Sequence, residues 1–194
     1  IAVGQGETAN VSYTSTRPDH ETLPPFLTAL GFVQQDAPEN LYCLTVDELA
    51  QSRFFEGVTS APRGAACFAE LPRGALSATY RAALVKGGAY LPFPLTDPRV
   101  DARVSVAVME RNEIRSFAVF TAPEPGRIDL AWVQSGRPQD MPLLLHAAYL
   151  RVRKHYPSET VMTVQAISPA AAALVTALLP HARPISHTYV RAIP

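Results

Sequence analysis

The amino-acid sequence predicts an α+β domain whose mixed, largely antiparallel central sheet is flanked by helices. Three observations predict this class. Apolar strand-like runs at residues 104–110, 114–121 and 127–134 follow one another, and their short connections favour an antiparallel meander. A long amphipathic stretch at 140–155 comes next, after a polar loop. The chain then alternates strand, helix and strand up to residue 193, which is typical of sheets with helices packed on them.

Composition limits the classes of protein that the chain can be. Its 194 residues, of which 47% are hydrophobic, suffice for one domain or for one domain plus a fragment. The 17 basic and 17 acidic side chains balance, which argues against nucleic acid or an anionic membrane as the partner and favours a small molecule or a protein. No apolar run approaches the ~20 residues that span a bilayer, and no secretory signal pattern is present, so we expect a cytoplasmic protein. The chain begins at Ile1, which is consistent with a fragment of a longer product.

Metal and redox sites are not predicted. Cys43 and Cys67 lie in separate strand-like runs, without the spacing of a metal-binding or redox pair, and are expected to be buried thiols. His146 and His155 fall on different faces of the long helix, and no ligand motif lies near them. Neither pair therefore has the pattern of a metal site.

Shorter elements are predicted in the first part of the chain. In the segment 21–30 the leucines and Phe26 fall on one helical face, and Gly31 is placed to end the helix. The predicted elements are, in order, a strand around Val11 and Tyr13, this helix, strands at 32–33 and 41–46, and a helix or helical turn at 47–55.

The rest of the chain carries longer elements with clear start and stop signals. Asp140 is predicted to cap the long helix, Pro142 lies in its first turn, and cations stand at its negative end. Ser168 and Pro169 are placed in the same way to begin a later helix. Besides the meander, the predicted elements are a strand at 65–71, a helix at 71–86 that ends at Gly87 and Gly88, the helix at 140–155, a buried strand at 160–167, a helix at 168–179 and a strand at 184–193.

Two segments of the chain resemble each other. The run FLTAL in the first predicted helix matches LVTAL in the last, and each is followed, after a turn, by a strand centred on a tyrosine, Tyr42 or Tyr189. The spacing between the helical run and the tyrosine is nearly the same in both. We therefore predict that residues 1–50 are the C-terminal part of a first repeat and that residues 51–194 form a second, complete copy.

The order of elements in residues 64–194 resembles the GNAT superfamily of acyl-CoA-dependent N-acetyltransferases. The segment ETLPPFLTALGFVQQDAPENLYCLTVDEL looks like the last helix, the Leu-Gly-Phe turn and the final strands of such a domain. The resemblance implies a tandem GNAT type with a GNAT-like sheet, acetyl-CoA as the cofactor, and a small-molecule amine or a peptide as the acceptor. The function predicted first is thus an acyl-CoA-dependent N-acyltransferase.

In that family, the loop before the long helix holds the diphosphate of the cofactor in a Gln/Arg-x-x-Gly-x-Gly/Ala pattern, at the positive end of the helix dipole. This chain keeps one glycine of the pattern, Gly136. Pro138 has no N–H to donate, and Asp140 adds a negative charge, so the loop is degenerate. The resemblance assigns cofactor binding to Val133, Gln134, Ser135, Gly136, Arg137, Gln139 and Met141.

Few residues qualify for catalysis. The family often uses a tyrosine on the helix after the fifth strand as an acid, whereas the matching run SPAAAALVTALLP has none. Glu110 and Asp129 are the candidate bases for an amine. Arg111, Glu113 and Arg115 are interpreted as a solvated hairpin edge.

Two other interpretations stay open. The departures in the loop favour a catalytically inactive GNAT-fold module that acts as a scaffold or protein-interaction domain. If the repeat is a coincidence, the chain is an unrelated α+β binding protein. A truncated first copy would leave an exposed sheet edge, from which we predict a homodimer.

Overall fold

The computed structural model describes residues 8–14, 21–35, 40–85 and 93–192. The helices are α1 (Leu23–Ala29), α2 (Val46–Ala50), α3 (Arg73–Val85), α4 (Asp140–His155) and α5 (Pro169–Leu178), with short 3-10 helices η1 (Arg53–Phe55) and η2 (Phe68–Glu70). The strands are β1 (Thr8–Thr14), β2 (Val33–Gln35), β3 (Asn40–Thr45), β4 (Ala65–Cys67), β5 (Val106–Glu110), β6 (Glu113–Thr121), β7 (Arg127–Gln134), β8 (Val161–Ala166), β9 (Arg183–Pro184) and β10 (Ser186–Ala192).

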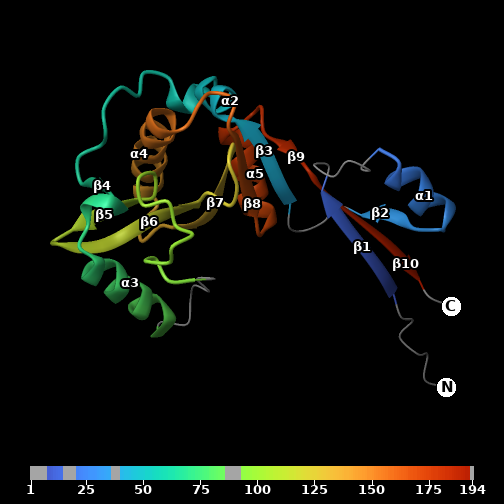
Figure 1. The fold of residues 1–194 in the computed structure, drawn as a ribbon, viewed down its shortest axis with the longest axis horizontal. Helices are drawn as coiled ribbons and strands as arrows, with labels where there is room; N and C mark the ends of the chain where they lie inside the picture. The colour runs from blue at the N-terminus through green and yellow to red at the C-terminus, as the bar shows by residue number, and fades with distance from the viewer. Residues whose placement is uncertain (1–7, 15–20, 36–39, 86–92, 193–194) are drawn as a thin grey trace.

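The larger sheet has seven strands in the order β4-β5-β6-β7-β8-β3-β9. Its neighbouring strands are antiparallel except for β7 and β8, which are parallel. Helix α4 lies on one face of this sheet and helix α3 on the other (Figure 1). The predicted class is therefore confirmed: the fold is α+β, with a mixed, largely antiparallel sheet flanked by helices.

Strand β6 supplies side chains to two separate cores. Phe120 belongs to the cluster that contains Leu144 of α4, whereas Phe117 belongs to the cluster that contains Leu76 of α3. Successive side chains of a strand point to opposite faces, so a central strand covered by helices on both sides is apolar at nearly every position. The predicted meander is confirmed, and its first turn is formed by Arg111 and Asn112, both with positive φ.

Several local features differ from the prediction. The strand from Ala65 ends at Cys67, because the chain turns into η2 and the Glu70 carboxylate accepts the Cys67 N–H. The helical turn predicted at 47–55 is two elements, α2 and η1, separated at Ser52. Asp140 is the first residue of α4, not its cap. Cys67 is buried and Cys43 only partly so. The stop predicted at residues 87–88 lies outside the described residues.

Strands β7 and β8 separate beyond Leu130. Their parallel pairing covers Arg127 to Leu130 of β7 and Val161 to Val164 of β8. Strand β7 nevertheless stays paired with β6 as far as Gln134, after a bulge at Ala131. A bulge bends its strand and increases the local twist, so it turns the end of β7 away from β8. The sheet therefore opens between these two strands.

The smaller sheet contains three strands in the order β1-β10-β2 (Figure 1). The element orders β1-α1-β2-β3 and β8-α5-β9-β10 are the same, but the last strand of each lies in the sheet of the other. Strand β3 pairs with both β8 and β9, and strand β10 pairs with both β1 and β2. The two series of elements are thus joined by the reciprocal pairing of β3 and β10, which we call strand exchange.

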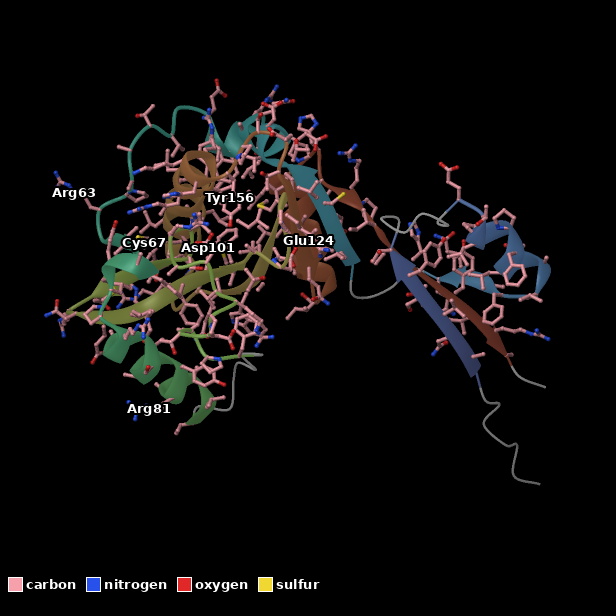
Figure 2. All side chains as sticks on the ribbon, viewed as in Figure 1. Arg63, Cys67, Arg81, Asp101, Glu124 and Tyr156 are labelled. Carbon is pink, nitrogen blue, oxygen red and sulfur yellow. The ribbon has the colours of Figure 1, made fainter. Side chains whose placement is uncertain are left out.

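The connection before β5 is tied to the end of α4. The Tyr156 hydroxyl donates to Asp101 at 2.5 Å, and Arg103 forms an ion pair with Asp101 at 2.6 Å (Figure 2). Burial alone would raise the pKa of Asp101, but hydrogen bonds from Arg103 and Tyr156 lower it to about 2.

Within the described ranges, every helix falls short of the length and apolar character that crossing a membrane requires.

Candidate functional site

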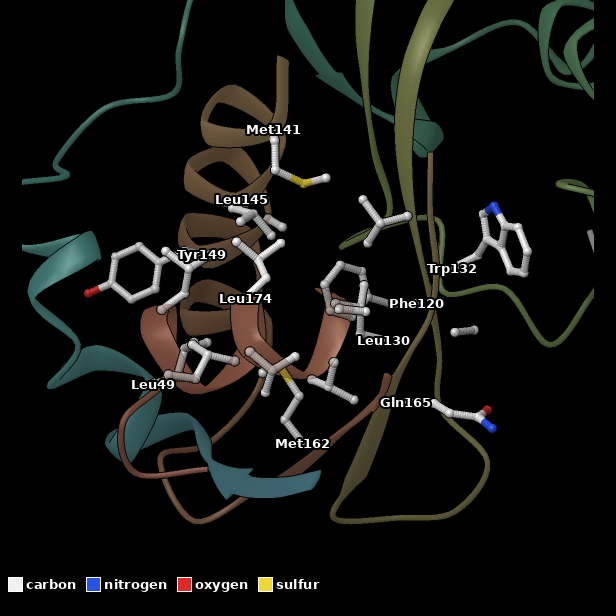
Figure 3. Close-up of a pocket in the computed structure, with 18 of the residues that line it drawn as sticks. Leu49, Phe120, Leu130, Trp132, Met141, Leu145, Tyr149, Met162, Gln165 and Leu174 are labelled. Carbon is white, nitrogen blue, oxygen red and sulfur yellow. The ribbon is translucent and has the colours of Figure 1, made fainter. Parts of the chain in front are cut away.

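A cavity of about 540 Å³ occupies the opening between β7 and β8. Helices α4 and α5 close it on one side (Figure 3). Met141 and Leu145 of α4, Leu174 of α5 and Leu130 of β7 are among its lining side chains (Figure 3). This volume is within the usual range of small-molecule sites, and apolar walls with few polar groups are typical of them.

Few of the side chains that line the cavity can take part in a reaction. Of the described residues that line it, none is an acid, a histidine, a lysine or an arginine. The Tyr149 ring stacks on Phe55, with ring centroids 4.4 Å apart, and its hydroxyl accepts a hydrogen bond from Arg153 at 2.9 Å. The Ser168 hydroxyl caps α5 by accepting the N–H of Ala171. The cavity can therefore hold an apolar group but offers no evident general base.

The loop between β7 and α4 is organised around Asp140, whose side chain is fully buried. Arg115 donates to its two carboxylate oxygens at 2.7 and 2.5 Å, and Ser116 donates at 2.5 Å. The hydrogen bonds from Arg115 outweigh burial and lower the pKa of Asp140 to about 2. The carboxylate is therefore charged at neutral pH, and it is directed towards β6 instead of capping its own helix.

The candidate base Glu110 lies beside this carboxylate. Its oxygens pair with Arg115 at 2.9 Å and with Arg137 at 3.1 Å. We refer to Asp140, Arg115, Ser116, Glu110 and Arg137 as the Asp140 cluster. The interpretation of Arg115 as part of a solvated hairpin edge is wrong, because its guanidinium binds the buried carboxylate of Asp140. The other candidate base, Asp129, accepts from Arg127 at 2.9 Å and from the Thr163 hydroxyl. Neither Glu110 nor Asp129 is among the cavity residues.

The predicted cofactor residues are distributed over several places. Val133 and Met141 line the cavity, whereas Gln134 lines a second cavity of about 330 Å³ between α3 and β6. The Ser135 hydroxyl donates to the Arg137 carbonyl at 2.5 Å, and Gln139 is the exposed residue before α4. The remaining members are Gly136, which packs against Arg115, and Arg137, which pairs with Glu110.

The loop does not fit a diphosphate. The N–H of Gly136 donates to Ser116 at 2.8 Å, and those of Asp140 and Met141 donate to loop carbonyls at 2.9 and 3.3 Å. Pro138 has no N–H. An anion at this helix end would find these three N–H groups engaged and a buried carboxylate beside them. The apolar cavity fits an acyl chain, but the loop does not fit the charged end of acetyl-CoA.

Gly136 is required where the loop crosses β6. A Cβ at this position would lie 2.7 Å from the Arg115 carbonyl oxygen. Gly136→Ala is therefore expected to lower the free energy of unfolding by about 1–3 kcal/mol, measured by urea denaturation. Gly74→Ala is the control, because Gly74 is exposed in the first turn of α3 and a Cβ there meets nothing within 4 Å, so the free energy of unfolding is expected to change by about 0.5 kcal/mol or less. Equal effects at both positions would contradict the close packing of the loop.

Within the described ranges, no group of three or more histidine, cysteine, aspartate or glutamate side chains is placed to hold a metal ion. The contacts of Arg115 and Ser116 with Asp140 were not predicted from the sequence. The one feature that could have indicated them is a pair of polar residues within the apolar part of β6.

Comparison with known proteins gives the fold a name. No family model matches the sequence, and neither does any curated protein. A solved GCN5-related N-acetyltransferase from Kribbella flavida is similar over 97% of this chain and 68% of its own, with a TM-score of 0.52 and 18% identity. Another from Sphaerobacter thermophilus is similar over 96% of this chain and 60% of its own, with a TM-score of 0.53 and 13% identity. The chain has the fold of the GCN5-related N-acetyltransferases and spans 60–68% of the length of these two proteins.

Proposed function

We propose that the chain is a GNAT-type N-acyltransferase domain that binds an acyl donor in the cavity between β7 and β8. The observation that carries the proposal is the apolar cavity of about 540 Å³ in the opening of the sheet. The acceptor is a small-molecule amine or a peptide. The similarity in fold to N-acetyltransferases supports the same class of reaction.

The proposed reaction transfers an acyl group from a thioester to an amine. The amine nitrogen forms a bond to the acyl carbon, the carbon–sulfur bond breaks, and the thiol leaves with a proton that the amine has lost. The bulge at Ala131 leaves backbone groups outside the ladder with β6, at the wall of the cavity, where they can orient the acyl carbonyl. With no carboxylate, histidine, lysine or arginine among the described lining residues, the proton passes from the amine to the thiolate through solvent.

A cavity-filling variant tests the proposal. Thiol release from an acyl thioester of N-acetylcysteamine, which carries no nucleotide, is measured with a panel of amines. Ala171→Phe places a ring on the cavity wall of α5 and is expected to lower release at least about tenfold. Ala173→Phe is the matched control, because Ala173 is exposed on the same helix and outside the cavity lining, and it is expected to leave release unchanged. Equal rates in both variants would contradict transfer at this cavity.

A second candidate is a catalytically inactive GNAT-fold module that acts as a scaffold or protein-interaction domain. It is favoured by the Asp140 cluster, which fills the loop, and by the scarcity of ionisable groups at the cavity. If no thioester binds at millimolar concentration and no thiol is released, this candidate replaces the first.

We further propose that residues 1–50 are the C-terminal part of a first GNAT-like repeat and that residues 51–194 are a second domain. The identical order of elements on the two sides of the strand exchange supports this division. Strand β1 is an edge strand of its sheet within the described residues, which is compatible with the predicted homodimer. Light scattering tests the dimer. The cytoplasmic location stays a prediction.

A further inference from the structure

The Arg115 and Ser116 side chains beside the β7–α4 loop already bind an anion, the carboxylate of Asp140. Two arginine nitrogens and one hydroxyl converge on the Asp140 carboxylate, and the same Ser116 hydroxyl accepts the Gly136 N–H. A guanidinium with two parallel N–H groups, a hydroxyl and a backbone N–H are also the usual ligands of a phosphate oxygen. The carboxylate therefore takes the place that an external anion would occupy.

We propose that Asp140 is a specificity-determining residue, whose carboxylate fills the anion position of the loop and excludes donors that carry a diphosphate. The ligand of the cavity is then an uncharged acyl chain or an acyl thioester without a nucleotide. This inference rests on the proposed function for the use of the cavity, and it deepens that function by naming the class of donor.

Space at the loop supports the exclusion. The Asp140 side chain has no exposed surface, so its carboxylate fills the anion position beside Arg115. The backbone of the loop lies so close to β6 that a Cβ on Gly136 would meet the Arg115 carbonyl oxygen at 2.7 Å. The buried position beside Arg115 can therefore take the phosphate group of a donor only if the carboxylate leaves it.

The charges at the loop also support the exclusion of a diphosphate. Within the Asp140 cluster, Arg115 and Arg137 face the two carboxylates Asp140 and Glu110, so the charges balance. A diphosphate would add negative charge beside a buried carboxylate whose pKa of about 2 keeps it ionised. The cavity itself offers no cation among the described lining residues. An uncharged ligand is not repelled by the Asp140 carboxylate and does not need a cation.

Two variants with the same change in charge test the proposal. Asp140→Ala and Glu110→Ala each remove one carboxylate from Arg115, but only the first empties the buried position. The full chain is titrated with inorganic diphosphate by calorimetry. Asp140→Ala is expected to bind diphosphate at least about tenfold more tightly than the native chain and than Glu110→Ala. Equal gains in both variants would mean that net charge alone decides, and an absent gain in a folded Asp140→Ala would likewise overturn the proposal.

The native chain provides a test that does not depend on the folding of a variant. In a two-dimensional NMR titration with diphosphate, the amide signals of Gly136 and Met141 are expected to stay in place at millimolar concentration. Saturable shifts of these two signals would overturn the proposal. Because inorganic diphosphate has no acyl group, either outcome is independent of whether the chain transfers acyl groups.

Discussion

Asp140→Ala is expected to lower the free energy of unfolding by about 3 kcal/mol, the largest effect of any single substitution considered for the site. The reason is that the variant leaves the Arg115 guanidinium, which is 21% exposed, without its buried partner. The Ser116 hydroxyl loses its acceptor at the same time. Urea denaturation at neutral pH measures the loss.

The control is Glu110→Ala, which removes the more exposed carboxylate of the same arginine. Exposed ion pairs contribute little, so this variant is expected to lose about 1 kcal/mol or less. A loss from Asp140→Ala no larger than that from Glu110→Ala would contradict the central place of Asp140 in the loop.

The pH dependence follows from the pKa of Asp140. Its folded-state pKa is depressed from 3.8 to about 2, so its contribution to stability is present above pH 3.8 and is lost as the pH falls towards 2. The native chain is expected to lose stability in this window, and Asp140→Ala is expected to lose less there.

Removal of residues 1–50 is expected to abolish cooperative folding of the remainder. The deletion takes away β3, which lies between β8 and β9, together with the buried side chains of Tyr42, Leu44 and Leu49. Each large buried side chain alone is worth about 2–5 kcal/mol, and a small domain has about 5–15 kcal/mol in all. Calorimetry of a chain of residues 51–194 is expected to show no thermal transition.

A shorter deletion is the matched control. A chain of residues 36–194 loses β1, α1 and β2 but keeps β3, so the seven-stranded sheet is complete. It is expected to retain one cooperative transition. If residues 51–194 unfold as cooperatively as residues 36–194, strand exchange does not hold the larger sheet together.

The sequence predicted the elements best where local signals agree. Helix α4 has a proline in its first turn and Arg153 to His155 in its last turn, and α5 begins with the cap Ser168 and Pro169; both helices form as predicted. The meander was predictable because the apolar runs of β5, β6 and β7 are separated by short polar connections. Each of these signals depends on neighbours in sequence.

Pairings between distant residues were not predictable in this way. Tyr42 and Tyr189 occur in equivalent patterns, and nothing in either pattern says that each strand joins the sheet of the other. The burial of Asp140 was missed for a similar reason. An acid at the start of a helix is a good cap, and only the tertiary structure shows that Arg115, on a strand 25 residues earlier, competes for its carboxylate.

We propose that the cavity binds the acyl end of a donor while the loop excludes a diphosphate. One calorimetric comparison tests it most directly: titration of the native chain with acetyl-CoA and with the acetyl thioester of N-acetylcysteamine. Acetyl-CoA is expected to bind at least about tenfold more weakly than the thioester, because the loop excludes its diphosphate. Binding of acetyl-CoA that is as tight as that of the thioester, or tighter, would contradict the exclusion.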